Sequence, residues 1–181
     1  MAAKKNSETE LTVGQKAPVF SLPDQNGKKM RLSEYNGKWL VIYFYPKDNT
    51  PGCTLEAIDF TKEAPKFKKA GIEIVGISPD SGESHCRFIE KQRLDLTLLT
   101  DADHVVAQKF GVWRLKKLYG RAYEGIYRST FLVDPKGKIA FVWYGVQVIG
   151  HANQVLEKAK ETQKKTLKNV FLAKNDFVEP K

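Results

Sequence analysis

Apolar residues gather in short runs along this chain, and the longer segments between the runs mix apolar with polar positions. The runs at 39–45 and 72–78 are rich in β-branched and aromatic residues and have the length of buried strands. Between them, residues 53–71 place apolar side chains at helical spacing. This strand, helix, strand order predicts two parallel strands joined by a right-handed crossover. Pro65 lies inside the helical segment and is expected to bend or divide it.

Turn-forming residues separate the other predicted elements. Residues 25–28 predict the turn of an N-terminal β-hairpin, and residues 134–137 predict the turn of a second hairpin. The remaining predicted elements are a helical turn from Ser33, a helix after residue 81, an extended segment at 96–100, a helix over 101–111, a basic loop at 113–128 and a helix from residue 151.

Together these elements predict an α/β protein with a central mixed β-sheet flanked by helices and an N-terminal β-hairpin, which is the plan of a thioredoxin-like fold. Residues 1–10 are predicted to be a flexible segment, 11–162 the folded domain, and 163–181 a basic C-terminal extension. Periodicity is weak beyond residue 162, where the apolar residues at 170–172 and 177–178 are candidate docking points.

The composition is that of an ordinary globular domain: of 181 residues, 41% are hydrophobic and 28% are charged. No apolar run approaches the roughly 20 residues that span a bilayer, and no signal-peptide segment follows the N-terminus. We therefore expect a cytoplasmic protein without membrane contact. The net charge of +9 comes largely from residues 113–128 and 160–181. No recognisable nucleic-acid-binding motif accompanies these charges, so a solvated basic surface is the favoured interpretation.

Cys53 lies where a predicted strand passes through a loop rich in proline and glycine into the first turn of a helix. The first N–H groups of a helix have no intrahelical partner and carry partial positive charge, which favours a nucleophilic thiolate there. Thr50 can offer a hydroxyl, Pro46 stiffens the loop, and Gly52 lets the backbone approach a reactant. The alternative interpretation of Cys53 is a small buried hydrophobe.

Residues 46–57, PKDNTPGCTLEA, contain the pattern Pro-x-x-x-Thr-x-x-Cys, and a distant strand at 128–134 reads RSTFLVD. Together with Gly76–Ser81, Ser84-His85 and Tyr119-Gly120, these segments resemble the peroxiredoxins, in the form typical of the peroxiredoxin Q, or bacterioferritin comigratory protein, subfamily. The resemblance spans residues 11–160. It implies a thiol-dependent peroxidase that reduces hydrogen peroxide and organic hydroperoxides without a cofactor or a metal.

The resemblance also implies roles for individual residues. Cys53 would be the peroxidatic cysteine, whose thiolate attacks the O–O bond and becomes a sulfenic acid. Arg128 would favour the thiolate and donate hydrogen bonds to the peroxide oxygens, and Thr50 would hydrogen-bond the sulfur or the peroxide. Pro46 would shield the site from water, and Glu56 would orient Arg128.

The second cysteine departs from the usual position. Members with a resolving cysteine in the same helix carry it five residues after the first, where this chain has Ile58. The remaining thiol is Cys86, about one turn before the position near Ile89 that other members use. We expect a monomer with a Cys53–Cys86 disulfide that thioredoxin or a similar thiol reduces, which requires the two Cα atoms to come within about 7 Å. The alternative is a one-cysteine peroxidase resolved by an external thiol.

Two further functions stay open at this stage. A thiol-disulfide oxidoreductase on the same fold is disfavoured because Glu56, not a cysteine, stands three residues after Cys53. A basic binding protein without enzymatic activity is the other. His85, His104 and His151 lack an accompanying cluster of metal ligands, so structural or surface roles are favoured for all three.

Overall fold

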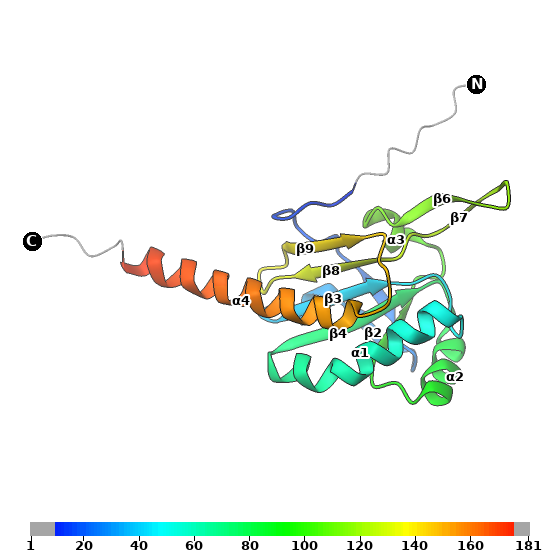
Figure 1. Cartoon of the computed structure of the whole chain (residues 1–181), viewed down its shortest axis with the longest axis horizontal. Helices are drawn as coiled ribbons and strands as arrows, with labels where there is room; N and C mark the ends of the chain where they lie inside the picture. The colour runs from blue at the N-terminus through cyan, green and yellow to red at the C-terminus, as the bar shows by residue number, and fades with distance from the viewer. Residues whose placement is uncertain (1–9, 176–181) are drawn as a thin grey trace, which may run out of the picture.

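The computed structural model describes residues 10–175, in which a five-stranded mixed sheet forms the centre (Figure 1). In spatial order its strands are β5 (Thr97–Thr100), β4 (Ile72–Ser78), β3 (Trp39–Phe44), β8 (Ser129–Val133) and β9 (Ile139–Tyr144). The central strand β3 pairs in parallel with β4 and antiparallel with β8, and β8 pairs antiparallel with β9. The predicted mixed sheet and the hairpin around 134–137 are therefore confirmed.

Strand β3 contributes to the hydrophobic core on both faces of the sheet. Leu40, Ile42 and Phe44 belong to one buried cluster, whereas Val41 and Tyr43 belong to the other. Successive side chains of a strand point to opposite faces, so an uninterrupted apolar run is what a strand covered on both sides requires. Full burial of a large apolar side chain stabilises the fold by about 1.5–3 kcal/mol.

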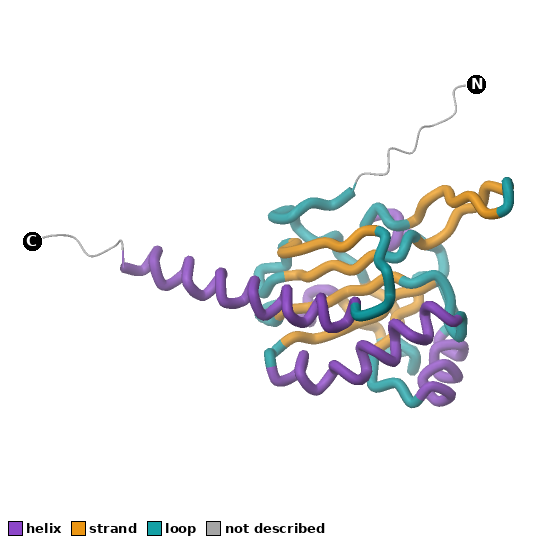
Figure 2. Tube along the Cα trace, viewed as in Figure 1, coloured by secondary structure: helices purple, strands orange, loops and turns teal. Residues whose placement is uncertain are grey.

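Helices cover both faces of this sheet. On one face lie α1 (Pro51–Lys69), α2 (Gly82–Gln92) and α4 (His151–Asn175), and Figure 2 shows α1 and α4 crossing the sheet side by side. The other face is covered by the hairpin β1 (Ser21–Pro23) and β2 (Lys29–Arg31), the short 3-10 helix η1 (Leu32–Tyr35), and α3 (Val105–Lys109). This arrangement confirms the thioredoxin-like plan with an N-terminal hairpin.

Pro65 was expected to bend or divide the first long helix, and division is wrong, because α1 continues through it. A proline in a helix interior removes one backbone hydrogen bond and is unfavourable by about 3 kcal/mol. Phe60 and Phe67 lie on either side of Pro65 and are both fully buried against the sheet. Their packing holds both halves of α1 on the same surface and outweighs the local penalty.

The basic segment predicted as a loop is instead a β-hairpin, formed by β6 (Trp113–Leu118) and β7 (Arg121–Ile126), which extends beyond the main sheet in Figure 1. Its two-residue turn contains Tyr119 at φ 49° and Gly120 at φ 74°. Two successive positive φ angles are those of a type I′ turn, which usually contains asparagine, aspartate or glycine at its first central position. Because Tyr119 occupies that position here, the usual sequence signal of such a turn is missing.

The last helix is longer than its sequence pattern suggests. Helix α4 runs to Asn175, so most of the predicted C-terminal extension is helical and projects past the sheet (Figure 1). Gln163 donates its side-chain N–H to the carbonyl of Ala70 at 2.9 Å, whereas Leu167 and Phe171 further along are 70% and 66% exposed. Residues 1–9 and the candidate docking residues 177–178 lie outside the described residues. No helix within residues 10–175 combines the length and apolarity needed to cross a membrane.

Candidate active site

Cys53 is the third residue of α1, and the loop that follows β3 carries the chain to it. Asn49 turns this loop with φ 58°, a conformation that asparagine tolerates better than most residues. Thr50 then adopts an extended conformation before Pro51 starts the helix, the position at which proline is most favourable. Cys53 is 1% exposed and lies in the first turn of the helix, where the backbone N–H groups have no intrahelical partner. The predicted strand-to-helix position of the cysteine is confirmed.

Arg128 reaches this cysteine from a distant part of the sequence. Strand β8 is antiparallel to β3, and Ser129 is paired with Phe44, so the residue preceding β8 lies beside the end of β3. Arg128 Nη2 donates a hydrogen bond to Cys53 Sγ at 3.2 Å. A Cβ on residue 52 would lie 3.4 Å from the same nitrogen, so Gly52 keeps this approach open. A charge-assisted hydrogen bond of this kind stabilises the thiolate.

Glu56 holds the other side of the same guanidinium. Arg128 Nη1 donates to Glu56 Oε2, and the Glu56 side chain is 1% exposed. Burial raises the pKa of Glu56 to about 7, although the charge of Arg128 opposes this shift. The pKa of Arg128 is raised because the charges of Glu56 and Cys53 outweigh its own burial. One fixed cation therefore connects a buried carboxyl group to a buried sulfur.

In the described part of the chain, three other predicted site residues lack the direct hydrogen bond to Cys53 Sγ that Arg128 makes. Thr50 donates its hydroxyl hydrogen to the carbonyl of Lys47 at 2.9 Å, which leaves its oxygen to accept a hydrogen bond. Pro46 is half-buried in the loop after β3, two residues past Phe44. Cys86 is a free, exposed thiol on α2 that donates to the backbone carbonyl of Gln25 at 3.0 Å. Its expected role in resolution stays a prediction.

Two residues near the site have no counterpart in the sequence predictions. The hydroxyl of Tyr43, on β3, is buried without a hydrogen-bond partner in the described part of the chain. Burial raises the pKa of Tyr43, and the nearby charges of Glu56 and Cys53 raise it further. Burial and the charge of Arg128 lower the pKa of Lys116, whose ammonium donates to the carbonyl of Ile126 at 2.9 Å. A polar side chain inside an otherwise apolar strand was the available signal for Tyr43.

The three histidines are used within the fold. His85 and His151 are buried with polar partners, and the ring of His104 stacks on Trp113 with centroids 3.8 Å apart. Burial lowers the pKa of His151 to about 4, so it is neutral at physiological pH. Within residues 10–175, no group of three histidine, cysteine or carboxylate side chains is arranged to hold a metal ion.

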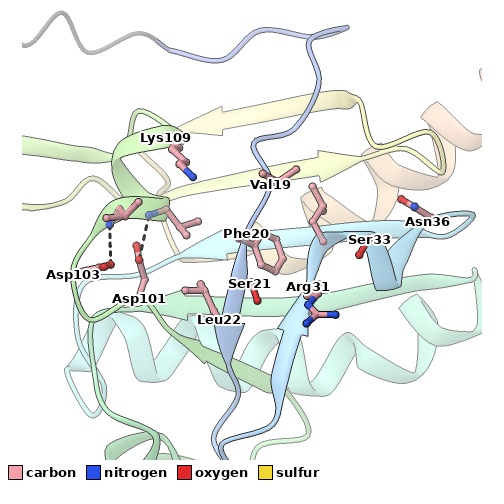
Figure 3. Close-up of a pocket in the computed structure, with 13 residues that line it drawn as sticks. Val19, Phe20, Ser21, Leu22, Arg31, Ser33, Asn36, Asp101, Asp103 and Lys109 are labelled. Carbon is pink, nitrogen blue, oxygen red and sulfur yellow. Dashed lines mark hydrogen bonds between the residues drawn. The ribbon is translucent and has the colours of Figure 1, made fainter.

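A cavity of about 680 Å³ lies away from this site (Figure 3). It lies between the N-terminal hairpin and α3, and Phe20, Leu22 and Val106 in its lining belong to the core cluster on the face of the sheet opposite Cys53. Figure 3 shows Asp101 and Asp103 at its edge, bonded to backbone N–H groups at the start of α3. No cysteine lines the cavity, so it is separate from the reactive thiol.

A buried cysteine at a helix N-terminus, hydrogen-bonded to an arginine that also pairs with a buried carboxyl group, provides the groups that a thiol-dependent peroxidase requires, on a thioredoxin-like sheet. The chain belongs to the AhpC/TSA family, whose model matches residues 13–142. Within that family it is a peroxiredoxin of the peroxiredoxin Q, or bacterioferritin comigratory protein, subfamily.

Known proteins of this subfamily match nearly their whole length to this chain. Peroxiredoxin Bcp of Bacillus subtilis is 45% identical over 155 residues, which are 86% of this chain and 99% of the relative. Peroxiredoxin Bcp of Escherichia coli is 44% identical over 151 residues, 83% of this chain and 97% of the relative. The solved bacterioferritin comigratory protein of Xanthomonas campestris, described for alkyl peroxide reduction, is 41% identical with a TM-score of 0.78 and covers 83% of this chain and 98% of its own.

Proposed function

We propose that Cys53 is the peroxidatic cysteine and Cys86 the resolving cysteine of an atypical two-cysteine peroxidase that thioredoxin or a similar dithiol reduces. The observation that carries the first assignment is the 3.2 Å hydrogen bond from Arg128 Nη2 to Cys53 Sγ. A fixed cation at this distance favours the thiolate, and a guanidinium also has donors left for a peroxide oxygen. The substrate class is hydrogen peroxide and organic hydroperoxides, which the relative named for alkyl peroxide reduction supports.

In the first step, the Cys53 thiolate attacks the hydroxyl oxygen of the peroxide. An S–O bond forms, the O–O bond breaks, and the leaving alkoxide or hydroxide takes up a proton to give an alcohol or water. Cys53 is oxidised to a sulfenic acid, and the peroxide is reduced. Negative charge moves from sulfur to oxygen during this step, and Arg128 donors stabilise it along the way. Thr50 would accept the hydrogen bond of the peroxide O–H, Pro46 would limit water, and Glu56 would keep the guanidinium aligned.

In the second step, Cys86 sulfur attacks the sulfenic sulfur of Cys53. The S–S bond forms, the S–O bond breaks, and the hydroxide leaves with the proton of the Cys86 thiol as water. A dithiol then reduces the disulfide by thiol-disulfide exchange. Cys53 is buried and Cys86 is exposed on a separate helix, so this step requires a local movement.

Single-turnover mixing with peroxide tests the assignments. We expect rapid loss of one thiol followed by a Cys53–Cys86 disulfide in peptide maps by mass spectrometry, and no rapid loss in Cys53→Ser. Persistent sulfenic acid on Cys53 with free Cys86 would instead support the one-cysteine mechanism with an external thiol. Cys86→Ser is the matched variant, because it should retain the first step and lose turnover with thioredoxin.

A binding protein without peroxidase activity would show only slow and unselective oxidation of its thiols. The peroxide reaction of Cys53 therefore separates that alternative from the proposed function. We also propose that the chain acts as a cytoplasmic monomer, and light scattering of the reduced and oxidised protein measures its oligomeric state.

A further inference from the structure

A buried polar cluster connects the segment that carries Cys53 to the segment that carries Cys86. Asp48, in the loop before α1, is 6% exposed and accepts side-chain hydrogen bonds from Tyr45 Oη at 2.7 Å, Ser84 Oγ at 2.8 Å and His85 Nδ1 at 2.9 Å. Ser84 and His85 lie at the start of α2 and immediately precede Cys86. Figure 1 shows α2 on the same side of the molecule as the N-terminal end of α1.

Asp48 and His85 meet in a buried contact, in which the His85 side chain is 0% exposed and the Asp48 side chain 2%. The second ring nitrogen of His85, Nε2, lies 3.3 Å from the carbonyl oxygen of Leu99, so both ring nitrogens face oxygen atoms. Although burial alone raises it, hydrogen bonds from His85, Tyr45 and Ser84 hold the pKa of Asp48 below its ordinary value. A buried carboxylate that loses one of these donors loses part of the compensation for its burial.

A second contact joins the same two segments. The backbone N–H of Asp48 donates to Asp80 Oδ2 at 2.9 Å, and Ser78 Oγ donates to the same oxygen at 2.7 Å. Asp80 lies between β4 and α2, so each segment places one carboxylate against the other. These hydrogen bonds fix the loop before Cys53 and the start of α2 at one relative position.

That position is not the one in which the two sulfurs react. Cys53 is 1% exposed beside Arg128, whereas Cys86 is exposed and bonded to the carbonyl of Gln25. A disulfide requires Cα atoms within about 7 Å and a specific orientation of the two Cβ atoms. A movement that carries the start of α2 away from the loop as Cys86 approaches Cys53 breaks the hydrogen bonds of Asp48 to Ser84 and His85.

We infer that Asp48 and His85 are positioning residues for the resolving step, which fix the two cysteine-bearing segments at a relative position where the sulfurs do not meet, and so limit the rate of disulfide formation until they release. The inference rests on the proposed resolving role of Cys86. The buried contact between Asp48 and His85 takes no part in the proposed attack on the peroxide. A slow resolving step also lengthens the life of the sulfenic acid, which more peroxide can then oxidise further.

The test separates the two chemical steps in a single turnover with one equivalent of peroxide, stopped at intervals by trapping the sulfenic acid and the free thiols for mass spectrometry. In Asp48→Asn, we expect Cys53 oxidation at the wild-type rate and disulfide formation about tenfold faster, a factor that corresponds to about 1.4 kcal/mol. Ser84→Ala removes one hydrogen bond of Asp48 and should give a smaller acceleration. This milder variant keeps the test decisive if Asp48→Asn does not fold. Glu83→Gln, which alters an exposed pair with Arg87 on the same helix, is the control and should change neither rate.

Hydrogen exchange provides a second readout on the reduced protein. We expect the amides of α2 to exchange faster in Asp48→Asn than in wild type, and those of α1 beyond its first turns to be unchanged. Disulfide formation at the wild-type rate or slower would overturn the inference. So would an equal loss in both steps, which would indicate that Asp48 only supports the fold. If sulfenic acid persists and no disulfide forms in wild type or any variant, the resolving role of Cys86 fails and this inference falls with it.

Discussion

Replacing Glu56 by glutamine tests the electrostatics at the centre of the site. Glu56 is 1% exposed, and its pKa is about 7 in the fold against an ordinary value of 4.5. Between these two values, the folded protein binds more protons than the unfolded chain, so its stability falls as the pH rises through this window. The difference between the two pKa values corresponds to about 3 kcal/mol of unfolding free energy. Glutamine cannot ionise, so the variant should lack this part of the pH dependence.

Urea unfolding at about pH 5 and about pH 8 measures the effect. Relative to Glu56→Gln, wild type is expected to lose about 3 kcal/mol of unfolding free energy between these conditions. The control is Glu63→Gln on the same helix, where the side chain is 21% exposed and pairs with Lys66 at 2.8 Å. Parallel pH profiles for wild type and Glu56→Gln would refute the argument, because they would mean that Arg128 fully compensates the burial of the carboxylate.

Two further substitutions and one truncation probe other parts of the structure. In Arg128→Lys, one ammonium cannot contact both partners of the guanidinium, so the second-order rate with peroxide should fall about 10²–10³-fold in stopped-flow mixing; a fall below tenfold contradicts this. In Gly76→Ala, the new Cβ would lie 2.7 Å from Tyr43 Cζ and 2.8 Å from Leu98 Cδ2, so unfolding free energy should drop by about 1–3 kcal/mol, and an unchanged melting temperature would contradict the packing. Truncation after Gln163 removes a helical segment with exposed apolar side chains and should leave peroxidase rates and melting temperature unchanged. A change in oligomeric state, measured by light scattering, would show that the segment mediates association.

The parts of the fold that sequence could predict are those governed by local patterns. The apolar run at 39–45 and the turn at 134–137 each carry enough information within a few residues to specify a strand or a hairpin. The position of Cys53 follows for the same reason, because a strand, a proline-rich loop and a helix start are consecutive in the chain. Arg128 was found only through the resemblance of its strand to a known family.

The wrong predictions arise where tertiary contacts override a local signal. Pro65 reads as a helix breaker, yet two buried phenylalanines keep α1 whole. Residues 113–128 were predicted as a basic loop, yet they form a hairpin in which Tyr119 takes a left-handed conformation because the strands on either side pair with each other. The contact of Asp48 with His85 joins residues 37 positions apart, and no local pattern reports such a contact.

In the proposed mechanism, burial of Cys53 serves the attack on the peroxide and hinders the resolving step with Cys86. In a low-dielectric site, the interaction of Arg128 with the sulfur is stronger than it would be in water, which favours attack on the peroxide. The same enclosure keeps the oxidised sulfur away from Cys86, so resolution requires a local opening with its own free energy. A polar connection between the two segments suits that requirement better than an apolar one, because the groups released by opening regain hydrogen bonds to water. The polar cluster around Asp48 can therefore hold the reactive geometry firmly and still open at modest free energy, which a purely hydrocarbon contact of the same area would not allow.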